Sequence, residues 1–164
     1  MIAPATPTNE SERVAALHEA AVLDTAPEED FDSIARLAAT ICDTPIARVS
    51  LVDSDRQYFK SCVAGGAMAG TPRDISFCGH AIIGRDIFEV CDAVQDDRFA
   101  DNPLVAQQPH IRFYAGAPLI TPDGYRLGTI CAIDVRPRRL SEAQRDTLSA
   151  LSRLVMRQLV RRRG

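Results

Sequence analysis

Cys78 has the most reactive placement of any side chain in this sequence. Ser76 is a typical helix-capping residue, and the residues after it predict a short helix over 77–83 that Gly84 closes. Cys78 would lie in the first turn of that helix, where the helix dipole and free N–H groups favour a thiolate. This placement predicts a redox or ligand-attachment site. The alternative is that Phe77 and Cys78 simply fill the junction between helix and sheet.

His80 follows Cys78 by two positions, which is a poor spacing for a shared metal ion. Helix positions i and i+2 do not face the same way, so one helix does not present both side chains to one ligand. The other histidines, His18 and His110, are far away in the sequence, and no Cx₂C or Hx₃H spacing occurs. No metal site is therefore expected, and His80 is predicted to be a half-buried residue that makes a hydrogen bond.

Asp92, Arg112 and Tyr114 are polar residues beside or within predicted strands. Asp92 directly follows a short strand, where its carboxylate would either bind a polar ligand or cap the next turn. Arg112 and Tyr114 alternate with Ile111 and Phe113, so the two pairs face opposite sides of the strand. The apolar pair is expected to pack against the terminal helices. On the other face, Arg112 would hold an anion by a two-pronged contact or form a structural bridge with Asp92.

The elements that must position these residues follow from periodicity and turn signals. Pro122-Asp123-Gly124 is a strong hairpin signal, and Ser141 with Gln144 is a capping pair for a long last helix. Glycines and small residues over 64–71 predict a loop. In chain order, we expect helices over 9–23 and 25–44, strands over 46–52 and 57–63, the short helix over 77–83, strands over 87–91, 111–121 and 125–135, and the last helix.

This order predicts an α+β fold. Strands joined mainly by hairpins form an antiparallel sheet of five or six strands, and the N- and C-terminal helices should cover one face. The loops and short helices between 64 and 109 must then lie on the other face or edge. Such an arrangement leaves a pocket under the loops, and we expect Phe77, Cys78, His80, Asp92, Arg112 and Tyr114 to be its ligand-binding residues.

Composition places the chain among ordinary globular domains. It has 164 residues, of which 46% are hydrophobic and 25% charged, which favours one domain over 9–160. We expect residues 1–8 to be a flexible arm and 161–164 a basic tail or the start of a linker. No secretory signal or membrane span is evident, and five cysteines without a CxxC predict free thiols in the cytoplasm.

Charge is distributed unevenly along the chain. From 136 to 164 there are nine arginines and two acidic residues, whereas the whole chain has a net charge of −3. A basic end can indicate contact with nucleic acid or membrane. Here the arginines interleave with apolar residues and no aromatic stacking partner lies among them, so we predict a solvated helix face or a domain junction and neither partner.

Several long motifs resemble those of GAF domains, particularly those at the N-termini of bacterial sensor histidine kinases and diguanylate cyclases. The resemblance covers about residues 10–160 and implies a central antiparallel sheet, terminal helices that often pair with a second subunit, and a pocket on the far face. The motifs are ERVAALHEAAVLDTAPEEDFDSIARLAA (12–39), VSLVDSDRQYFKS (49–61), SFCGHAI (76–82), VCDAVQDDRFADNPLV (90–105), HIRFYAGAPL (110–119) and GTICAIDVRPRRLS (128–141).

The resemblance also implies three alternative functions. The first is a non-catalytic module that senses an unidentified small molecule, forms a homodimer through its terminal helices and acts on a histidine kinase or diguanylate cyclase output domain. The second is a thiol-dependent reductase similar to the free methionine sulfoxide reductases, with Cys78 as a reacting group, although 102–114 lacks their further cysteines. The third is a structural dimerisation domain without a ligand.

Ligand chemistry is not fixed by the resemblance. The NKFDE signature of cyclic-nucleotide-binding members is absent, and so is the adjacent Cys-His pair of bilin-binding members. Some members use a histidine as an axial haem ligand, for which nothing singles out His80. The cofactor is therefore left open.

Overall fold

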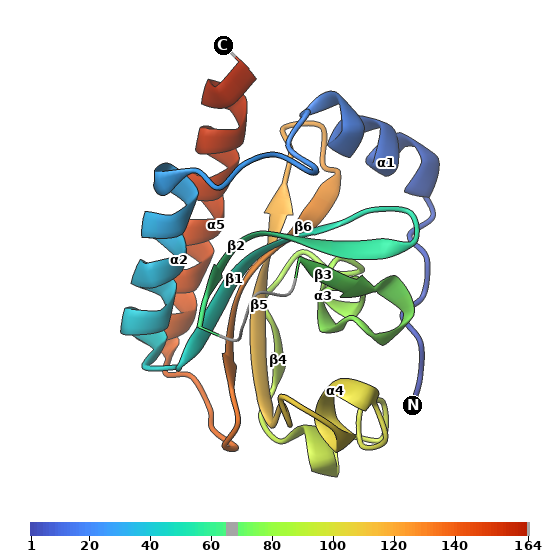
Figure 1. The fold of residues 1–164 in the computed structure, drawn as a ribbon, viewed down its shortest axis with the longest axis vertical. Coiled ribbons are helices and arrows are strands. Elements are labelled where there is room, and N and C mark those ends of the chain that lie inside the picture. Colours follow the sequence, from blue (N-terminus) through green and yellow to red (C-terminus); the bar gives the residue numbers. More distant parts are fainter. Residues whose placement is uncertain (65–68, 164) are drawn as a thin grey trace.

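The computed structural model describes residues 1–64 and 69–163 (Figure 1). The loop predicted over 64–71 lies partly outside these residues, and its end forms a short strand. The helices are α1 (Glu10–Glu19), α2 (Glu29–Cys42), α3 (Phe77–Ala81), α4 (Pro103–Ala106) and α5 (Glu142–Arg163), and the strands are β1 (Ile46–Val52), β2 (Arg56–Val63), β3 (Gly70–Pro72), β4 (Phe88–Val90), β5 (Phe113–Ile120) and β6 (Arg126–Asp134).

The strands form one six-stranded antiparallel sheet in the order β3-β2-β1-β6-β5-β4. Two hairpins, β1–β2 and β5–β6, lie side by side because β1 also pairs with β6. Gly124 closes the second hairpin with φ +90°, a conformation that residues with a Cβ rarely adopt. The prediction of an α+β fold with five or six antiparallel strands is confirmed.

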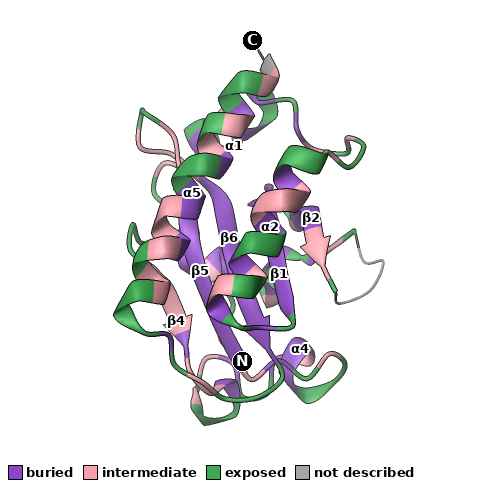
Figure 2. Ribbon diagram, turned by 90° about the vertical axis from the view of Figure 1, so that its left-hand side faces the viewer, coloured by how far each residue is buried: buried purple, intermediate pink, exposed green. Residues whose placement is uncertain are grey.

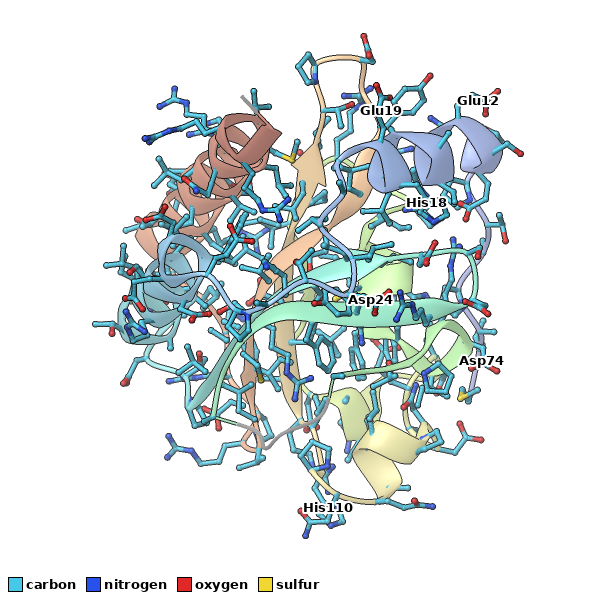
Figure 3. The ribbon with its side chains drawn as sticks, turned by 45° about the horizontal axis from the view of Figure 1, so that its top comes forward. Glu12, His18, Glu19, Asp24, Asp74 and His110 are labelled. Carbon is cyan, nitrogen blue, oxygen red and sulfur yellow. The ribbon has the colours of Figure 1, made fainter. Side chains whose placement is uncertain are left out.

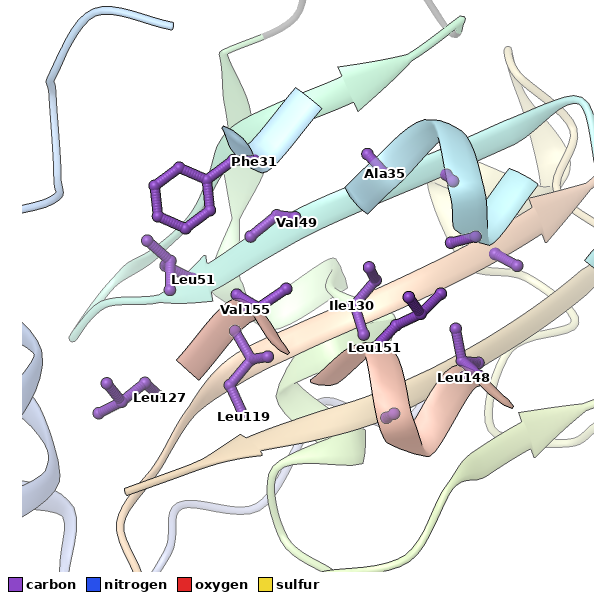
Figure 4. Packing of buried hydrophobic residues seen from close by; sticks show 14 of the residues in the cluster. Phe31, Ala35, Val49, Leu51, Leu119, Leu127, Ile130, Leu148, Leu151 and Val155 are labelled. Atoms are coloured by element: carbon purple, nitrogen blue, oxygen red, sulfur yellow. The ribbon is translucent and has the colours of Figure 1, made fainter. Parts of the chain in front are cut away.

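Helices α2 and α5 lie side by side over one face of the sheet (Figures 1 and 2). Their apolar stripes meet every second residue of β1, β5 and β6, because side chains alternate between the two faces of a strand. Burial of each large apolar side chain contributes about 1.5–3 kcal/mol. Figure 4 shows this helix-face core, which includes Phe31, Val49, Leu51, Ile130, Leu148, Leu151 and Val155.

Helix α5 begins with the capping pair that the sequence predicts. The backbone N–H of Gln144 donates to Ser141 Oγ at 3.1 Å, and the Gln144 side chain accepts from the Ser141 N–H at 2.8 Å. Residues 161–163, predicted as a tail or linker, continue the helix. Arg162 forms an ion pair with Glu28 at 2.7 Å, which ties this end of α5 to the segment before α2.

Helix α1 lies across the end of the sheet (Figure 1). The fully buried Arg13 donates to the carbonyl oxygens of Val52 at 2.7 Å and Arg126 at 3.3 Å, where β1 ends and β6 begins. Leu17 extends from α1 into the helix-face core. The first helix therefore closes one end of the same core that α2 and α5 cover.

The boundaries of the first two helices differ from the sequence prediction. Helix α1 does not continue to Leu23, because Ala21 and Asp24 have φ values of 54° and 58° and break the helical backbone. Thr25 does not cap α2; the N-cap position is Glu28. Local propensity alone could not anticipate this turn, which lies between two packed helices.

The opposite face of the sheet is covered by α3, α4 and the segments between them (Figure 1). The buried apolar residues on this side form a second cluster, the loop-face cluster, which includes Phe77 and Tyr114. Tyr114 therefore faces the loops and Phe113 faces the helices, as the strand alternation predicts. Ile111 was predicted to accompany Phe113, but it joins the loop-face cluster. The strand alternation does not apply to Ile111 because β5 begins only at Phe113.

The segment 1–8, predicted to be a flexible arm, runs over the loop face. The Ile2 N–H donates to the Arg98 carbonyl at 3.1 Å, and the Ile2 carbonyl lies 3.0 Å from His80 Nε2. Pro4 lies against Gly79, where an added Cβ would come within 2.7 Å of the proline ring. The mobility of this arm stays a prediction, while its contacts place it over α3.

Candidate functional site

Cys78 lies at the centre of a buried polar cluster between α3 and the sheet. Ser76 caps α3 as predicted, since its Oγ accepts from the Gly79 N–H at 3.0 Å. The Cys78 Sγ lies 3.0 Å from Tyr114 Oη on β5 and 3.1 Å from Thr129 Oγ1 on β6. The two hydroxyls lie 3.2 Å apart, so one thiol and two hydroxyl groups contact one another out of reach of bulk water.

A second thiol, that of Cys131 on β6, completes the cluster. Burial raises the pKa of Cys78, but hydrogen bonds from Cys131, Thr129 and Tyr114 outweigh it and lower this pKa to about 7. The hydrogen bond to Cys78, together with burial, raises the pKa of Cys131 well above its ordinary value. Burial and the charge on Cys78 likewise raise the pKa of Tyr114. The cluster therefore favours a thiolate at Cys78 with neutral neighbours.

The cause of this thiolate differs from the one that the sequence suggested. The sequence analysis assigned a lowered Cys78 pKa to the N-terminal dipole of its helix, but α3 has only five residues. The groups that lower the pKa come from β6, β5 and β1, which are distant in the sequence. The direction agrees with the prediction, and the physical cause belongs to the tertiary structure.

A small cavity of about 10 Å³ adjoins the cluster, which is room for about one water molecule. Beside it, Nε of Arg48 makes no hydrogen bond within the described residues. Oγ of Ser50 lies close enough to the thiols of Cys78 and Cys131 to lower their pKa values. Arg48 is only 5% exposed, and its guanidinium lies 4.3 Å from the centre of the Phe59 ring. A buried guanidinium with one N–H that makes no hydrogen bond, next to a cavity, is an arrangement that suits a small polar or anionic group.

Aromatic side chains fill most of the space that the sequence predicted as a pocket. Phe77 stacks on Phe99 with ring centres 4.1 Å apart and lies 5.3 Å from the Tyr114 ring. Among the described residues, a cavity of about 10 Å³ remains beside Cys78, lined by Phe77, Tyr114 and Ile111 among others. The loop-face hollow exists at the predicted place, but in this conformation it holds nothing larger than a water-sized molecule.

His80 lies apart from the cavity that Cys78 lines. Its Nε2 bonds to the N-terminal arm, and its ring stands edge-on to Phe99 at 4.8 Å. Burial is the main cause that lowers the His80 pKa. The other two histidines belong to other segments, as Figure 3 shows: His18 lies on α1 and His110 follows α4. Among the described residues, no group of three metal-ligating side chains comes together.

Asp92 and Arg112 do not reach the cavity either. The Asp92 carboxylate accepts from the Val94 N–H at 3.2 Å, so it caps the next turn, which is one of its two predicted roles. Arg112 donates from Nη1 to the carbonyls of Val105 at 3.0 Å and Ile111 at 3.1 Å. No ion pair joins Asp92 to Arg112 among the described residues. Both residues therefore stabilise loops, and the anion-binding candidate becomes Arg48.

The sequence analysis missed Arg48, Ser50 and Thr129, and it interpreted Cys131 only as a core residue. One signal could have identified the first two. Arg48 and Ser50 occupy alternate positions of an otherwise apolar strand, which places both on one face of a buried sheet. A buried strand that carries an arginine needs a polar partner on that face.

Apolar residues also remain exposed on the outer side of α5. Val160 is 60% exposed and Leu154 41%. A groove of about 480 Å³ runs beside Val160 between α5 and the β5–β6 hairpin, and its lining includes Ile120, Pro122, Met156, Arg157 and Arg161. The helix that covers the sheet therefore presents a second apolar surface to solvent.

The fold and the position of the site define a GAF domain. The sequence profile of this family matches residues 26–159, so the chain belongs to the GAF family. A cyclic di-GMP phosphodiesterase of Pseudomonas aeruginosa is 43% identical over 157 residues, which are 95% of this chain and 27% of that protein. The chain thus spans about a quarter of the length of the curated relative that it matches.

Solved structures share the fold at low sequence identity. A domain of a sensor histidine kinase from Sinorhizobium meliloti aligns with a TM-score of 0.64 and 17% identity, over 86% of this chain and 95% of that one. The type II free methionine-R-sulfoxide reductase of Thermoplasma acidophilum aligns with a TM-score of 0.65 and 12% identity, over 87% of this chain and 94% of that one. At these identities the likeness establishes the fold alone.

Proposed function

We propose that this GAF domain is a non-catalytic sensory module of a bacterial signalling protein. A small polar or anionic molecule in the loop-face cavity would change the arrangement of the terminal helices and so the output of a partner domain. The observation that carries this proposal is the buried Nε of Arg48, which makes no hydrogen bond within the described residues and lies beside a cavity. Leaving such a group unsatisfied costs about 1–3 kcal/mol, so a ligand that supplies an acceptor gains that energy.

Strand β1 links the cavity to the helices. Arg48 and Ser50 border the cavity, while the alternate residues Val49 and Leu51 pack in the helix-face core with α2 and α5. A displacement of β1 by a ligand therefore acts on both sides of the sheet. For a signal to result, the ligand must bind more tightly to one helix arrangement than to the other.

The output domain in this proposal is an enzyme of cyclic di-GMP metabolism or a histidine kinase. Support for the first comes from the Pseudomonas relative, in which the matching segment is 27% of a cyclic di-GMP phosphodiesterase. A sensor kinase domain with the same fold supports the second. A diguanylate cyclase output and a cytoplasmic location, both predicted from the sequence, belong to this proposal. Among the described residues, no helix is long and apolar enough to cross a membrane.

A homodimer through the terminal helices is the second part of the proposal. Leu154 and Val160 on α5, with Leu37 on α2, are large apolar residues that this chain leaves 41–60% exposed. A second copy would bury them in a two-fold interface, the commonest arrangement of soluble oligomers. Light scattering of the wild type and of Val160→Glu would test this, and a monomeric wild type across micromolar concentrations would contradict it.

Native mass spectrometry and a thermal-shift screen test the sensory proposal. A ligand present at 100 times its dissociation constant should stabilise the fold by about 2.7 kcal/mol. Arg48→Met should abolish that stabilisation, whereas Arg85→Met, which changes an arginine outside the cavity, should keep it. If anions and polar metabolites leave both the wild type and Arg48→Met unshifted while a dimer persists, the chain is a structural dimerisation domain.

The reductase alternative depends on Cys78 as a reacting group. The lowered pKa of Cys78 favours it, but the cavity of about 10 Å³ does not admit an amino-acid sulfoxide without movement of Phe77 or Tyr114. Turnover of free methionine sulfoxide with a thiol donor, lost in Cys78→Ser, would establish this activity and refute the non-catalytic proposal.

A further inference from the structure

Cys78 and Cys131 form a buried pair of thiols across the interface between α3 and the sheet. They are 53 positions apart in the sequence, yet both border the same small cavity, and a hydrogen bond from Cys131 acts on Cys78. Cys78 is 2% exposed and Cys131 1%. Two thiols that border one small cavity between a helix and a strand are candidates for a disulfide that forms without unfolding.

The surroundings of the pair favour nucleophilic chemistry at Cys78. Tyr114 and Thr129 lie within hydrogen-bond distance of its sulfur, and their hydroxyls stabilise a thiolate. Arg48, whose Nε makes no hydrogen bond within the described residues, borders the same cavity together with Ser50, and the two side chains can bind a negatively charged leaving group. The cavity has room for about one water molecule, so it selects for the smallest oxidants.

We propose that Cys78 and Cys131 are a peroxide-reactive pair that hydrogen peroxide converts to a disulfide. This inference deepens the proposed function by naming what the cavity responds to. It rests on that function only for the step from the disulfide to the terminal helices. The disulfide itself would form whether or not an output domain responds to it.

The reaction balances with hydrogen peroxide as the oxidant. The Cys78 thiolate attacks one peroxide oxygen; an S–O bond forms, the O–O bond breaks, and hydroxide leaves and takes up the former thiol proton as water. Cys131 then attacks the sulfur of the Cys78 sulfenic acid; an S–S bond forms, the S–O bond breaks, and a second water leaves with the Cys131 proton. Two thiols are oxidised and one peroxide is reduced to two waters.

The disulfide would connect α3 to β6, the strand that pairs with both β1 and β5. It would also remove the thiolate to which Tyr114 and Thr129 are bonded. On the other face, Ile130 of β6 packs in the core with α2 and α5. Oxidation at the loop face would therefore act on a strand that contacts the terminal helices.

Peptide mapping of the oxidised chain tests the proposal. The reduced protein, with the partly exposed Cys62 and Cys91 replaced by serine, is treated with one equivalent of hydrogen peroxide and digested without reduction. We expect a disulfide-linked peptide pair containing Cys78 and Cys131, and a loss of two thiols per chain. Cys42, which is buried on the helix face, should stay reduced. The rate should rise about tenfold from pH 6 to pH 8, following the thiolate fraction.

Single variants separate the two steps. Cys131→Ala should stop at a sulfenic acid on Cys78, which whole-protein mass spectrometry detects as the gain of one oxygen atom, and Cys78→Ala should leave Cys131 reduced. Cys42→Ala, a matched control at an equally buried position, should react like the parent. Far-ultraviolet circular dichroism and urea unfolding verify that each variant is folded.

Two outcomes would overturn the proposal. One is oxidation of Cys42 before the pair; the other is equal rates with hydrogen peroxide and the bulkier tert-butyl hydroperoxide, because the cavity would then not admit the oxidant selectively. A disulfide that forms without any change in dimerisation would leave this chemistry intact and count against the proposed sensory coupling. The two failures are thus distinguishable.

Discussion

Two buried thiols lie on opposite faces of the same sheet and have opposite properties. Cys42, at the end of α2, is 1% exposed in the helix-face core, and burial is the main cause that raises its pKa to about 11. Cys78, on α3, is 2% exposed in the loop-face cluster. Burial raises its pKa as well, but hydrogen bonds from its neighbours bring it down to about 7. Equal exposure to solvent therefore accompanies a raised thiol pKa on one face and a lowered thiol pKa on the other.

The difference lies in what each face of the strands contributes. Toward α2 and α5 the strands present Val49, Leu51 and Ile130, which offer no hydrogen bonds. Toward α3 they present hydroxyl, thiol and guanidinium groups, among them Tyr114 and Thr129. One face thus holds the fold together, and the other has the groups needed for binding or redox chemistry. Each of the following changes tests one side of this contrast.

The largest effect on stability should come from the helix face. Phe31→Ala removes a fully buried ring from the helix-face core and should lower the free energy of unfolding by about 3–5 kcal/mol. Urea denaturation measures this loss. A cost below about 1 kcal/mol would show that the helix face is not the main source of stability.

The pH dependence of stability should single out Cys78. Its pKa is about 7 in the folded chain and near 9.0 when unfolded, so ionisation stabilises the native state above pH 9. That contribution, about 2–3 kcal/mol, should disappear as the pH falls from 9 to 7. Urea unfolding of the wild type and of Cys78→Ala at several pH values measures how the free energy of unfolding of each depends on pH. The wild type should show the dependence and the variant should not.

Cys42 provides the control for that measurement. Its pKa is raised above the unfolded value of 9.0, so its contribution has the opposite sign and falls away only at higher pH. In Cys42→Ala, the free energy of unfolding should therefore change between pH 7 and pH 9 by the same amount as in the wild type. A wild type whose stability does not change over this interval would contradict the thiolate at Cys78.

A smaller effect is expected from single hydroxyl deletions on the two faces. Tyr114→Phe removes a buried hydroxyl that contacts Cys78 and Thr129, and should cost about 1–2 kcal/mol and raise the Cys78 pKa. Tyr58→Phe is the matched control, because its hydroxyl donates to the Thr25 carbonyl at 3.1 Å and has no other hydrogen-bond partner within the described residues. It should cost a similar amount and leave the thiol unchanged. Thiolate absorbance near 240 nm, followed against pH, distinguishes the two.

The smallest effect on stability should be at the outer surface of α5. Val160→Ser changes a side chain that is 60% exposed and should alter the free energy of unfolding of the monomer by no more than about 0.5 kcal/mol. The same change should weaken the proposed homodimer in sedimentation equilibrium. A large loss of monomer stability would show that this side of α5 is part of the core.

Local signals predicted much of the fold correctly. The hairpin turn before Tyr125, the Ser141 and Gln144 capping pair and the Ser76 cap all appear where the sequence placed them. These features depend on residues within a few positions of one another. The end of α1 was misplaced because Ala21 adopts a backbone conformation that its side chain does not favour.

The candidate site was predicted less completely than the fold. Cys78, Phe77 and Tyr114 do come together, as expected from helix capping and strand alternation. Asp92 and Arg112 stabilise loops instead, because their partners are backbone groups in turns that no periodic pattern describes. Several residues that border the cavity passed unnoticed because each looked like an ordinary strand residue.

The sequence alone determined the GAF fold, the two-faced strands and the capped cysteine, since these follow from hydrophobic alternation and from contacts between near neighbours. Only the tertiary structure decided that Cys78, Cys131 and Arg48 border one cavity and that Arg48 Nε makes no hydrogen bond there within the described residues. Those facts depend on which strands become neighbours in the sheet and on how α3 lies over them. A thiol's pKa is set by such neighbours through short-range hydrogen bonds and local burial, and these arise only when distant segments pack together.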